Sequence, residues 1–331
     1  MESRLISSGD IALRLGVLTS GGNAPGMNAA IRSVVRYAIP RGAEVYGIRR
    51  GFAGLITDQI VPLTLRSVGQ ILQYGGTILR TSRCKEFYTL EGIEKGAEVL
   101  RTHGIEGLVV IGGDGSAVGA MRLAEVSEIP CVCVPATIDN DIYGTDETIG
   151  FDTAVNTAVE AIDKIRDTAV SLERIFVVEV MGRNRGFLAL QVGLAVGASI
   201  ILVPEIKYNF ENVVRNLKSF EERGKETSIV VAAEGIGNTN ELVSFIENSA
   251  NYKVRLSKLG YIQRGGSPTA RSRLLADLFS VKAVELLLGG EKNKMVGIDG
   301  KRIIATDLSE VTSKTKPLDT ALYKLAEDLA V

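Results

Sequence analysis

The chain has 331 residues, of which 45% are hydrophobic and 23% charged, and its formal net charge is -1. This length exceeds what one hydrophobic core usually supports, so we expect two domains. The balanced charge lacks the basic excess of nucleic-acid-binding proteins, and no apolar run is long enough for a membrane helix or arranged as a signal peptide, which predicts a cytoplasmic protein that binds neither nucleic acid nor membrane.

The first predicted strand, residues 13–18, leads into a glycine loop at 19–26 and then a helix over 27–39. A strand, a glycine loop and a helix in this order present backbone N–H groups to an anion, and phosphate is the natural ligand. The loop has neither the Walker A spacing nor the dinucleotide spacing, which disfavours a dehydrogenase. After a second strand at 44–48, the segment 75–83 forms a glycine turn with two arginines.

Two acidic motifs follow the next predicted strands. A helix at 93–102 leads into an apolar run, after which the chain carries Asp114, and the run at 131–134 is followed by Asp139 and Asp141. In an open α/β sheet, ligands bind at the carboxyl ends of the strands. We therefore expect these carboxylates at one rim of a sheet.

The cysteines and the histidine limit the possible chemistry. Cys131 and Cys133 alternate in a predicted strand, where small buried residues are expected, so a disulfide or zinc site is disfavoured. His103 precedes Gly104 at a predicted helix end, which favours a capping role. General-base chemistry must then fall to carboxylates.

The second half continues the alternation of strands and helices, which predicts an α/β fold with parallel, doubly wound sheets. Further elements are expected at 152–167, 175–180, 200–203, 211–223, 229–233, 240–248, 254–259 and 272–288. Met181, Arg183, Glu234 and Arg264 follow the ends of strands. The last helix carries an apolar stripe that we expect to pack on a sheet, formed by Leu274, Leu275, Leu278, Val281, Val284 and Leu288.

Taken together, the strand ends offer an anion loop, carboxylates and arginines. Phosphoryl transfer needs these groups, because N–H groups and arginines hold the phosphates, one carboxylate binds a divalent metal ion, and another lies near the attacking hydroxyl.

Five motifs, in this order and spacing, resemble those of the bacterial ATP-dependent 6-phosphofructokinase family, and they lie at 21–28, 112–116, 137–141, 181–183 and 263–268. The resemblance extends from about Leu13 onward. It implies two doubly wound Rossmann-like lobes with mainly parallel sheets and the active site between them. The nucleotide-binding lobe would comprise 1–150, completed by about 263–312, and the sugar-phosphate lobe 151–262, completed by about 313–331.

The resemblance implies a phosphotransferase with an alcohol acceptor, which uses ATP as co-substrate and Mg²⁺ to phosphorylate the C1 hydroxyl of fructose 6-phosphate. The product would be fructose 1,6-bisphosphate, an intermediate of glycolysis. It also implies an allosteric homotetramer with active sites shared between subunits.

The family's site residues map onto this chain by their motifs. Asp139 would be the general base, and the catalytic set is completed by Gly22, Arg83, Thr137 and Arg183. The nucleotide would be bound by Gly22, Phe52, Arg83, Cys84, Gly113, Asp114, Gly115, Ser116 and Gly119. The sugar phosphate would be bound by Thr137, Asp139, Met181, Gly182, Arg183, Glu234, Tyr261 and Arg264, together with Arg174 and Arg255 of a neighbouring subunit. The metal ligands would be Asp114 and, nearby, Asp141, and the effector positions Arg32, Arg36, Arg166, Arg223 and Lys225.

Two positions bear on the phosphoryl donor. Family members that use pyrophosphate typically carry Asp at the position of Gly115 and Lys at that of Ala136, where they fill the space of the ATP α-phosphate. Both residues are small here, which favours ATP. The alternatives are a pyrophosphate-dependent enzyme and a non-catalytic regulatory nucleotide-binding subunit on the same fold.

Several positions depart from the family pattern. Asn23, Cys84, Tyr88 and Tyr261 replace an acid, an aromatic residue, an arginine and a histidine, respectively. In the effector region, Leu65 and Ser199 replace a basic and an acidic residue. Because these changes remove a phosphate clamp and a charge partner, we expect weakened control by ADP and phosphoenolpyruvate.

Overall fold

The computed structural model describes residues 13–225, 227–250 and 252–330. The chain divides into two compact units. Unit 1 comprises Met1–Thr137, Ile142–Gly150 and Gly265–Lys316, and unit 2 comprises Ile138–Asp141, Phe151–Arg264 and Pro317–Val331. Among the described residues, no helix has the length and apolar character needed to cross a bilayer.

Unit 1 is built on a seven-stranded sheet of order β11-β10-β5-β4-β1-β2-β3. The strands are β1 (Arg14–Ser20), β2 (Glu44–Ile48), β3 (Ile60–Leu63), β4 (Gly107–Gly112), β5 (Cys131–Pro135), β10 (Lys294–Asp299) and β11 (Arg302–Asp307). The five central strands pair in parallel, and the edge strands β3 and β11 pair antiparallel to their neighbours. Pro62 lies in the edge strand β3, where a missing N–H breaks no central ladder.

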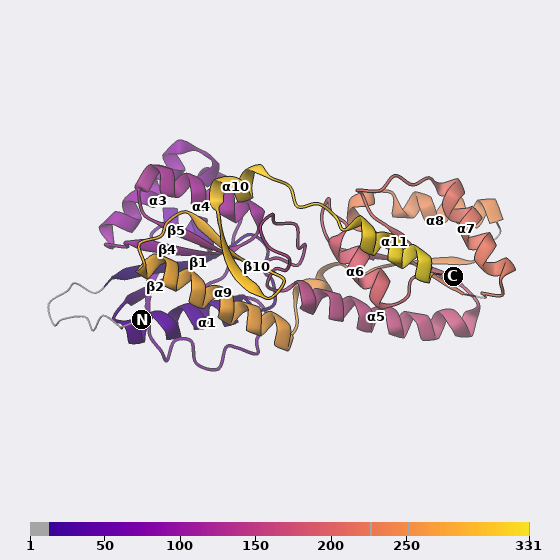
Figure 1. The fold of residues 1–331 in the computed structure, drawn as a ribbon, viewed down its shortest axis with the longest axis horizontal. Coiled ribbons are helices and arrows are strands. Elements are labelled where there is room, and N and C mark those ends of the chain that lie inside the picture. The colour runs from indigo at the N-terminus through magenta and orange to yellow at the C-terminus, as the bar shows by residue number, and fades with distance from the viewer. Residues whose placement is uncertain (1–12, 226, 251, 331) are drawn as a thin grey trace. The chain divides into compact units, whose positions relative to one another are not determined.

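Helices cover both faces of this sheet (Figure 1). They are α1 (Met27–Ala38), α2 (Gly51–Ile56), α3 (Leu90–Thr102), α4 (Asp114–Ser127), α9 (Ala270–Leu288) and α10 (Leu308–Ser313), with 3-10 turns at Ile39–Arg41 and Glu86–Tyr88. Helices α1 and α9 pack side by side on one face, and α3 and α4 lie together on the other. His103 is the C-cap of α3, as the sequence predicted.

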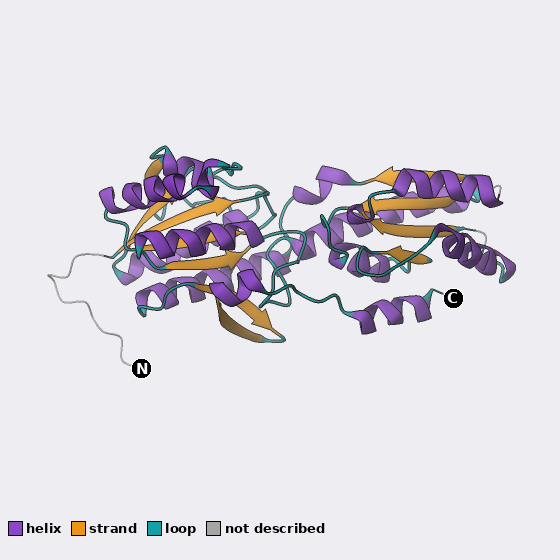
Figure 2. Cartoon of the chain, turned by 90° about the horizontal axis from the view of Figure 1, so that it is seen from above, coloured by secondary structure: helices purple, strands orange, loops and turns teal. Residues whose placement is uncertain are grey.

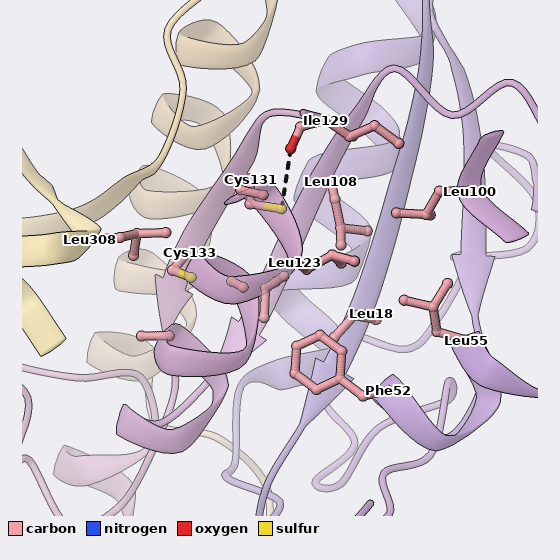
Figure 3. Packing of buried hydrophobic residues seen from close by; sticks show 14 of the residues in the cluster. Leu18, Phe52, Leu55, Leu100, Leu108, Leu123, Ile129, Cys131, Cys133 and Leu308 are labelled. Atoms are coloured by element: carbon pink, nitrogen blue, oxygen red, sulfur yellow. Dashed lines mark hydrogen bonds between the residues drawn. The ribbon is translucent and has the colours of Figure 1, made fainter. Parts of the chain in front are cut away.

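The core beneath α3 and α4 contains two cysteines among its aliphatic side chains (Figure 3). Cys131 and Cys133 are free and buried, and the Cys131 thiol donates to the carbonyl of Ile129 at 3.6 Å. Burial raises the pKa of Cys131 to about 12 and that of Cys133 well above its usual value. Both therefore act as small core residues, which confirms their prediction.

The prediction for the apolar stripe of α9 is wrong in part. Leu275 and Val284 are fully buried, but the side chains of Leu274, Leu278 and Leu288 are 51%, 39% and 38% exposed. The helix instead buries a face that includes small residues, which are Ala276, Ser280 and Ala283. Close packing against α1 favours such residues, and a search for large apolar side chains overlooks them.

Unit 2 has a four-stranded sheet of order β7-β8-β6-β9, in which every pairing is parallel (Figure 2). Its strands are β6 (Ile175–Val180), β7 (Ile200–Leu202), β8 (Ser228–Ala233) and β9 (Val254–Lys258). Its helices are α5 (Phe151–Leu172), α6 (Phe187–Ala195), α7 (Phe210–Glu222), α8 (Thr239–Ala250) and α11 (Thr320–Leu329), with 3-10 turns at Glu234–Ile236 and Gly260–Arg264. The predicted α/β class with mainly parallel sheets is confirmed.

Candidate active site

Three parallel strands of unit 1 end side by side, and each is followed by a predicted site loop. Ser20 at the end of β1 pairs with Gly112 at the end of β4, which in turn pairs with Pro135 at the end of β5. The three following loops therefore leave the sheet at the same edge. This geometry concentrates backbone N–H groups and short side chains in one place.

The first of these loops is held in a shape that only glycine adopts easily. Gly21 and Gly26 have φ angles of 85° and 112°, and a Cβ at Gly26 would lie 2.6 Å from Cγ2 of Ile149. Gly22 is exposed, and Gly26, the N-cap of α1, has no side chain to cap the helix. The predicted strand, glycine loop and helix are therefore present, an arrangement that suits the presentation of N–H groups to an anion.

The arginine-bearing segment 75–83 is fastened onto this glycine loop. The hydroxyl of Thr81 donates to the carbonyl of Gly21 at 2.7 Å, and that of Thr19 donates to the carbonyl of Arg80 at 2.9 Å. The buried side chain of Asn28 accepts from the N–H of Ile78 at 2.8 Å. Hydrogen bonds therefore hold together two loops that are far apart in sequence.

Arg83 lies at the end of this fastened segment. Its side chain is exposed and makes no ion pair with any residue in the described part of the chain. An arginine that is carried by an anchored backbone and is not neutralised by an acid suits the binding of an anionic ligand.

The second loop places Asp114 and Gly115 in the first turn of α4, and both residues are exposed. A Cβ at Gly115 would meet no atom within 4 Å. A Cβ at Gly113 would lie 3.7 Å from the Cβ of Thr137, so the second and third loops are in contact. This part of the edge has room for a ligand beside a carboxylate.

Other residues of the predicted nucleotide set face inward. Phe52 is 5% exposed, stacks on Phe87 with ring centroids 4.2 Å apart, and lies where a Cβ of Gly119 would approach its ring to 2.8 Å. Ser116 is buried against Gly112. These two side chains shape the loop from beneath, and Cys84 is half-buried against the same core.

The chemistry of Asp114 fits a magnesium ion. Mg²⁺ is commonly held by one or two carboxylates, with substrate phosphates and water as its other ligands. Asp114 offers such a carboxylate at an open edge, and Asp141 is partly exposed in unit 2. Among the described residues, no group of three or more His, Cys, Asp or Glu side chains forms a closed metal cage. An open site of this kind suits a metal ion that arrives with a nucleotide.

In unit 2, two strand ends again lie in register. Val180 at the end of β6 pairs with Ala233 at the end of β8. The loop after β6 carries Met181, Gly182 and Arg183, and Glu234 follows β8 directly. A carboxylate oxygen of Glu234 accepts from the backbone N–H of Arg183 at 2.6 Å. The two loops are thus joined by a charge-assisted hydrogen bond.

Asp139 is paired with the side chain of the same arginine. Nε of Arg183 lies 3.3 Å from Oδ2 of Asp139, and the two side chains are 48% and 1% exposed. Arg183 has a φ of 52°, in the left-handed region that non-glycine residues seldom adopt. An unusual backbone conformation next to a buried carboxylate is typical of functional sites. Thr137, two residues before Asp139, is also buried.

The turn at Gly260–Arg264 contains a residue whose role the sequence did not reveal. Gln263 is fully buried, accepts from the N–H of Met181 at 3.4 Å and donates to the carbonyl of Gly260 at 3.0 Å. It joins this turn to the loop after β6. Two predicted sugar-phosphate ligands lie beside it in the turn: Tyr261, which is 84% exposed, and the half-buried Arg264. In the sequence, only its position in the motif at 263–268 pointed to Gln263.

Two predicted sugar-phosphate ligands lie elsewhere. Arg174 directly precedes β6, and Arg255 is the second residue of β9, where it pairs with Phe176. Both therefore lie at the amino ends of their strands, whereas Met181 and Glu234 lie at the carboxyl ends. The structure does not bring Arg174 and Arg255 to the other predicted ligands of the same chain.

The predicted effector positions fall on both units. Arg32 and Arg36 lie on α1, and Arg223 follows α7. In unit 2, burial and, secondarily, the charge of Arg166 lower the pKa of Lys225, so these two cations are neighbours. Of the departures, Leu65 is exposed and Ser199 is buried.

Comparison with known proteins agrees with this geometry. The sequence model of the phosphofructokinases matches residues 14–287. The ATP-dependent 6-phosphofructokinases of Bacillus licheniformis and Bacillus cereus are each 54% identical to this chain over 318 residues, which cover 96% of this chain and 99% of theirs.

Solved structures show the same fold. A phosphofructokinase from Saccharomyces cerevisiae has a TM-score of 0.86 at 33% identity, and the match covers 96% of this chain and 48% of that longer one. A pyrophosphate-dependent phosphofructokinase from Marinobacter aquaeolei has a TM-score of 0.83 at 26% identity, covering 93% and 86% of the two chains. The chain belongs to the phosphofructokinase family.

Proposed function

We propose that the protein transfers the γ-phosphoryl group of ATP to the C1 hydroxyl of fructose 6-phosphate, giving fructose 1,6-bisphosphate and ADP. The observation that carries the proposal is the buried Asp139 beside Arg183, whose backbone is held by Glu234. A nucleotide-binding protein without acceptor chemistry has no need for such a carboxylate. The 54% identity to ATP-dependent enzymes supports the same reaction.

In the proposed mechanism, the carboxylate of Asp139 accepts the proton of the C1 hydroxyl as its oxygen attacks the γ-phosphorus. The bond between the γ-phosphorus and the bridging oxygen breaks, and ADP leaves with that electron pair. Arg183 orients the carboxylate, since its guanidinium lies 3.3 Å away. Arg83 and Thr137 are proposed to stabilise the charge on the phosphoryl group in flight.

The glycine loop with Gly22 and the start of α4 with Gly113, Asp114 and Gly115 are proposed to bind the nucleotide. Mg²⁺, held by Asp114 with Asp141 nearby, would supply neutralisation of the phosphate charge. For the sugar phosphate we propose Met181, Gly182, Arg183, Glu234, Tyr261 and Arg264. Because Arg174 and Arg255 lie at the amino ends of their strands, we propose that they serve a neighbouring subunit in a cytoplasmic homotetramer.

The first alternative is pyrophosphate as donor. The open space at Gly115 disfavours pyrophosphate. Pyrophosphate lacks the α-phosphate and nucleoside of ATP, so an enzyme that uses it has no need for that space. Ala136, the second position that bears on the donor, is less informative, because it is only 1% exposed and a buried position can favour a small residue through packing alone.

A donor exchange tests the proposal. Purified protein is assayed with fructose 6-phosphate and Mg²⁺, with either ATP or pyrophosphate, and the bisphosphate product is measured. Turnover with ATP alone is the expected result. Turnover with pyrophosphate alone would establish the first alternative, and binding of ATP without product from either donor would establish a regulatory subunit.

A further inference from the structure

A short buried segment, residues 148–150, contacts the loop that carries Asp139. The hydroxyl of Thr148, which is fully buried, donates to the carbonyl of Thr137 at 2.6 Å. The next N–H, that of Ile149, donates to the carbonyl of Pro135 at 3.0 Å, and Ile149 forms a β-bridge with Ala136. The segment therefore continues the strand pairing of β5 up to the residue before Ile138.

The same segment contacts the glycine loop after β1. A Cβ at Gly150, whose φ is 99°, would lie 2.7 Å from the Cβ of Ala24 and 3.3 Å from the carbonyl oxygen of Pro25. Ile149 in turn approaches the backbone of Gly26 so closely that no side chain fits there. Segment 148–150 is thus packed between the proposed phosphate loop and the loop of the proposed base.

We infer that Thr148 is a positioning residue that acts on Asp139 through the backbone of Thr137. The inference rests on the proposed function. The peptide unit between Thr137 and Ile138 is planar and rigid, so a hydrogen bond that holds its oxygen also sets the direction of its N–H and of the chain that follows. Ile138 is fully buried, which leaves the backbone little freedom before Asp139.

The hydroxyl of Thr148 therefore fixes the orientation of this peptide, which packing of the side chain alone would not do. Thr148→Val keeps nearly the same shape but removes the hydroxyl that donates to the carbonyl of Thr137. The peptide plane then loses one of its constraints, and its reorientation moves Asp139. A shift of about 1 Å in a reacting group can lower a rate about 10²-fold, so the cost should appear in kcat.

Ser127 provides a matched control in unit 1, at the end of α4. It is also buried, donates to the carbonyl of Leu123 at 2.7 Å and accepts from the N–H of Ile129 at 3.1 Å. Ser127→Ala removes a comparable buried hydroxyl, whose bonds hold the end of α4 and the chain before β5 and not the loop of Asp139. Its effect should be on stability.

The experiment compares wild type, Thr148→Val, Thr148→Ser and Ser127→Ala by kcat, by KM for both substrates, and by Tm. We expect Thr148→Val to lower kcat about 10-fold to 100-fold while both KM values stay within about threefold. The serine variant, which keeps the hydroxyl, should restore kcat to within about threefold of wild type. Ser127→Ala should lower Tm and leave kcat within the same range.

Three results would overturn the role: wild-type kcat in Thr148→Val, an equal loss of kcat in Ser127→Ala, or a Thr148→Ser variant as slow as Thr148→Val. If Thr148→Val does not fold, Thr148→Cys, with its weaker S–H donor, should give a kcat between those of wild type and the expected valine value, and full activity would contradict the inference. Wild-type protein that phosphorylates no fructose 6-phosphate would overturn the proposed function, and this role with it, before any variant is compared.

Discussion

The carboxyl edges of the two sheets differ in the chemical groups that they present. At the edge of unit 1, exposed glycines and helix starts predominate, and the space beside Gly115 is open. At the edge of unit 2, charged side chains predominate: Arg183 and Glu234 follow its strands, and Arg183 pairs with Asp139, which follows β5 and is grouped with unit 2. Parallel strands that end in register thus produce two kinds of site. One presents backbone N–H groups beside an open space, and the other presents charged side chains that are fixed by their partners.

The difference follows from what each proposed ligand requires. Phosphates of a nucleotide are bound well by N–H groups that approach closely, which glycine permits. A sugar hydroxyl becomes reactive only if a base is held at the right distance and angle, and this requires side chains that are fixed by partners. Substitutions on the two edges should therefore have separable kinetic effects.

The largest effect is expected for Asp139→Ser. Removing a general base lowers kcat by about 10² to 10⁴, and the KM for fructose 6-phosphate should change little because the phosphate ligands remain. Steady-state kinetics with both substrates varied would measure this. Asp163→Ser, on the exposed side of α5, serves as the control and should retain activity. An equal loss of sugar binding in Asp139→Ser would show that the change disturbs folding instead.

A smaller effect, confined to the nucleotide, is expected for Gly115→Asp. A carboxylate placed in the open space would face the phosphates of ATP, and a like-charge contact of about 2 kcal/mol raises the KM for ATP about 30-fold. The KM for fructose 6-phosphate should stay within about threefold. Gly115→Ala adds only a Cβ, which meets no atom within 4 Å, and should raise the KM for ATP much less. Similar effects of the two substitutions would argue against a phosphate at this position.

The smallest effect is expected for Glu234→Gln, which keeps the shape of the side chain and weakens its hydrogen bond to the N–H of Arg183. A charged acceptor is worth about 1 kcal/mol more than a neutral one, so the KM for fructose 6-phosphate should rise about fivefold. The KM for ATP should not change. Glu211→Gln, in the exposed first turn of α7, is the matched control. A rise in the KM for ATP instead would contradict the expectation that substitutions on the two edges have separable kinetic effects.

The sequence predicted the elements with strong apolar periodicity. The strands Glu44–Ile48 and Ile175–Val180 have the bounds that were expected, because buried parallel strands are continuous apolar runs between breaks. The hairpin of β10 and β11 and the short helix α10 were missed. Their residues alternate less regularly, and their positions depend on partners that are distant in sequence.

For the candidate site, the sequence located the loops better than the side chains. Phe52 and Ser116 were assigned to the nucleotide by resemblance, but packing buries both. Gln263 and Thr148 were missed for the opposite reason, since nothing in a local pattern distinguishes a buried polar side chain that holds a backbone from one that faces solvent. Only tertiary contacts reveal the difference.

The division of the chain has a consequence for its synthesis. The chain passes between the units five times, at 137/138, 141/142, 150/151, 264/265 and 316/317. In unit 1, β10 pairs with β5, and α9 covers α1. During translation, one face of α1 therefore stays uncovered until residues 270–288 have left the ribosome, and the edge of β5 stays unpaired until residues 294–299 have left it. Unit 1 begins first but is completed only after most of unit 2 has been made, and unit 2 in turn is completed by its last segment, Pro317–Val331.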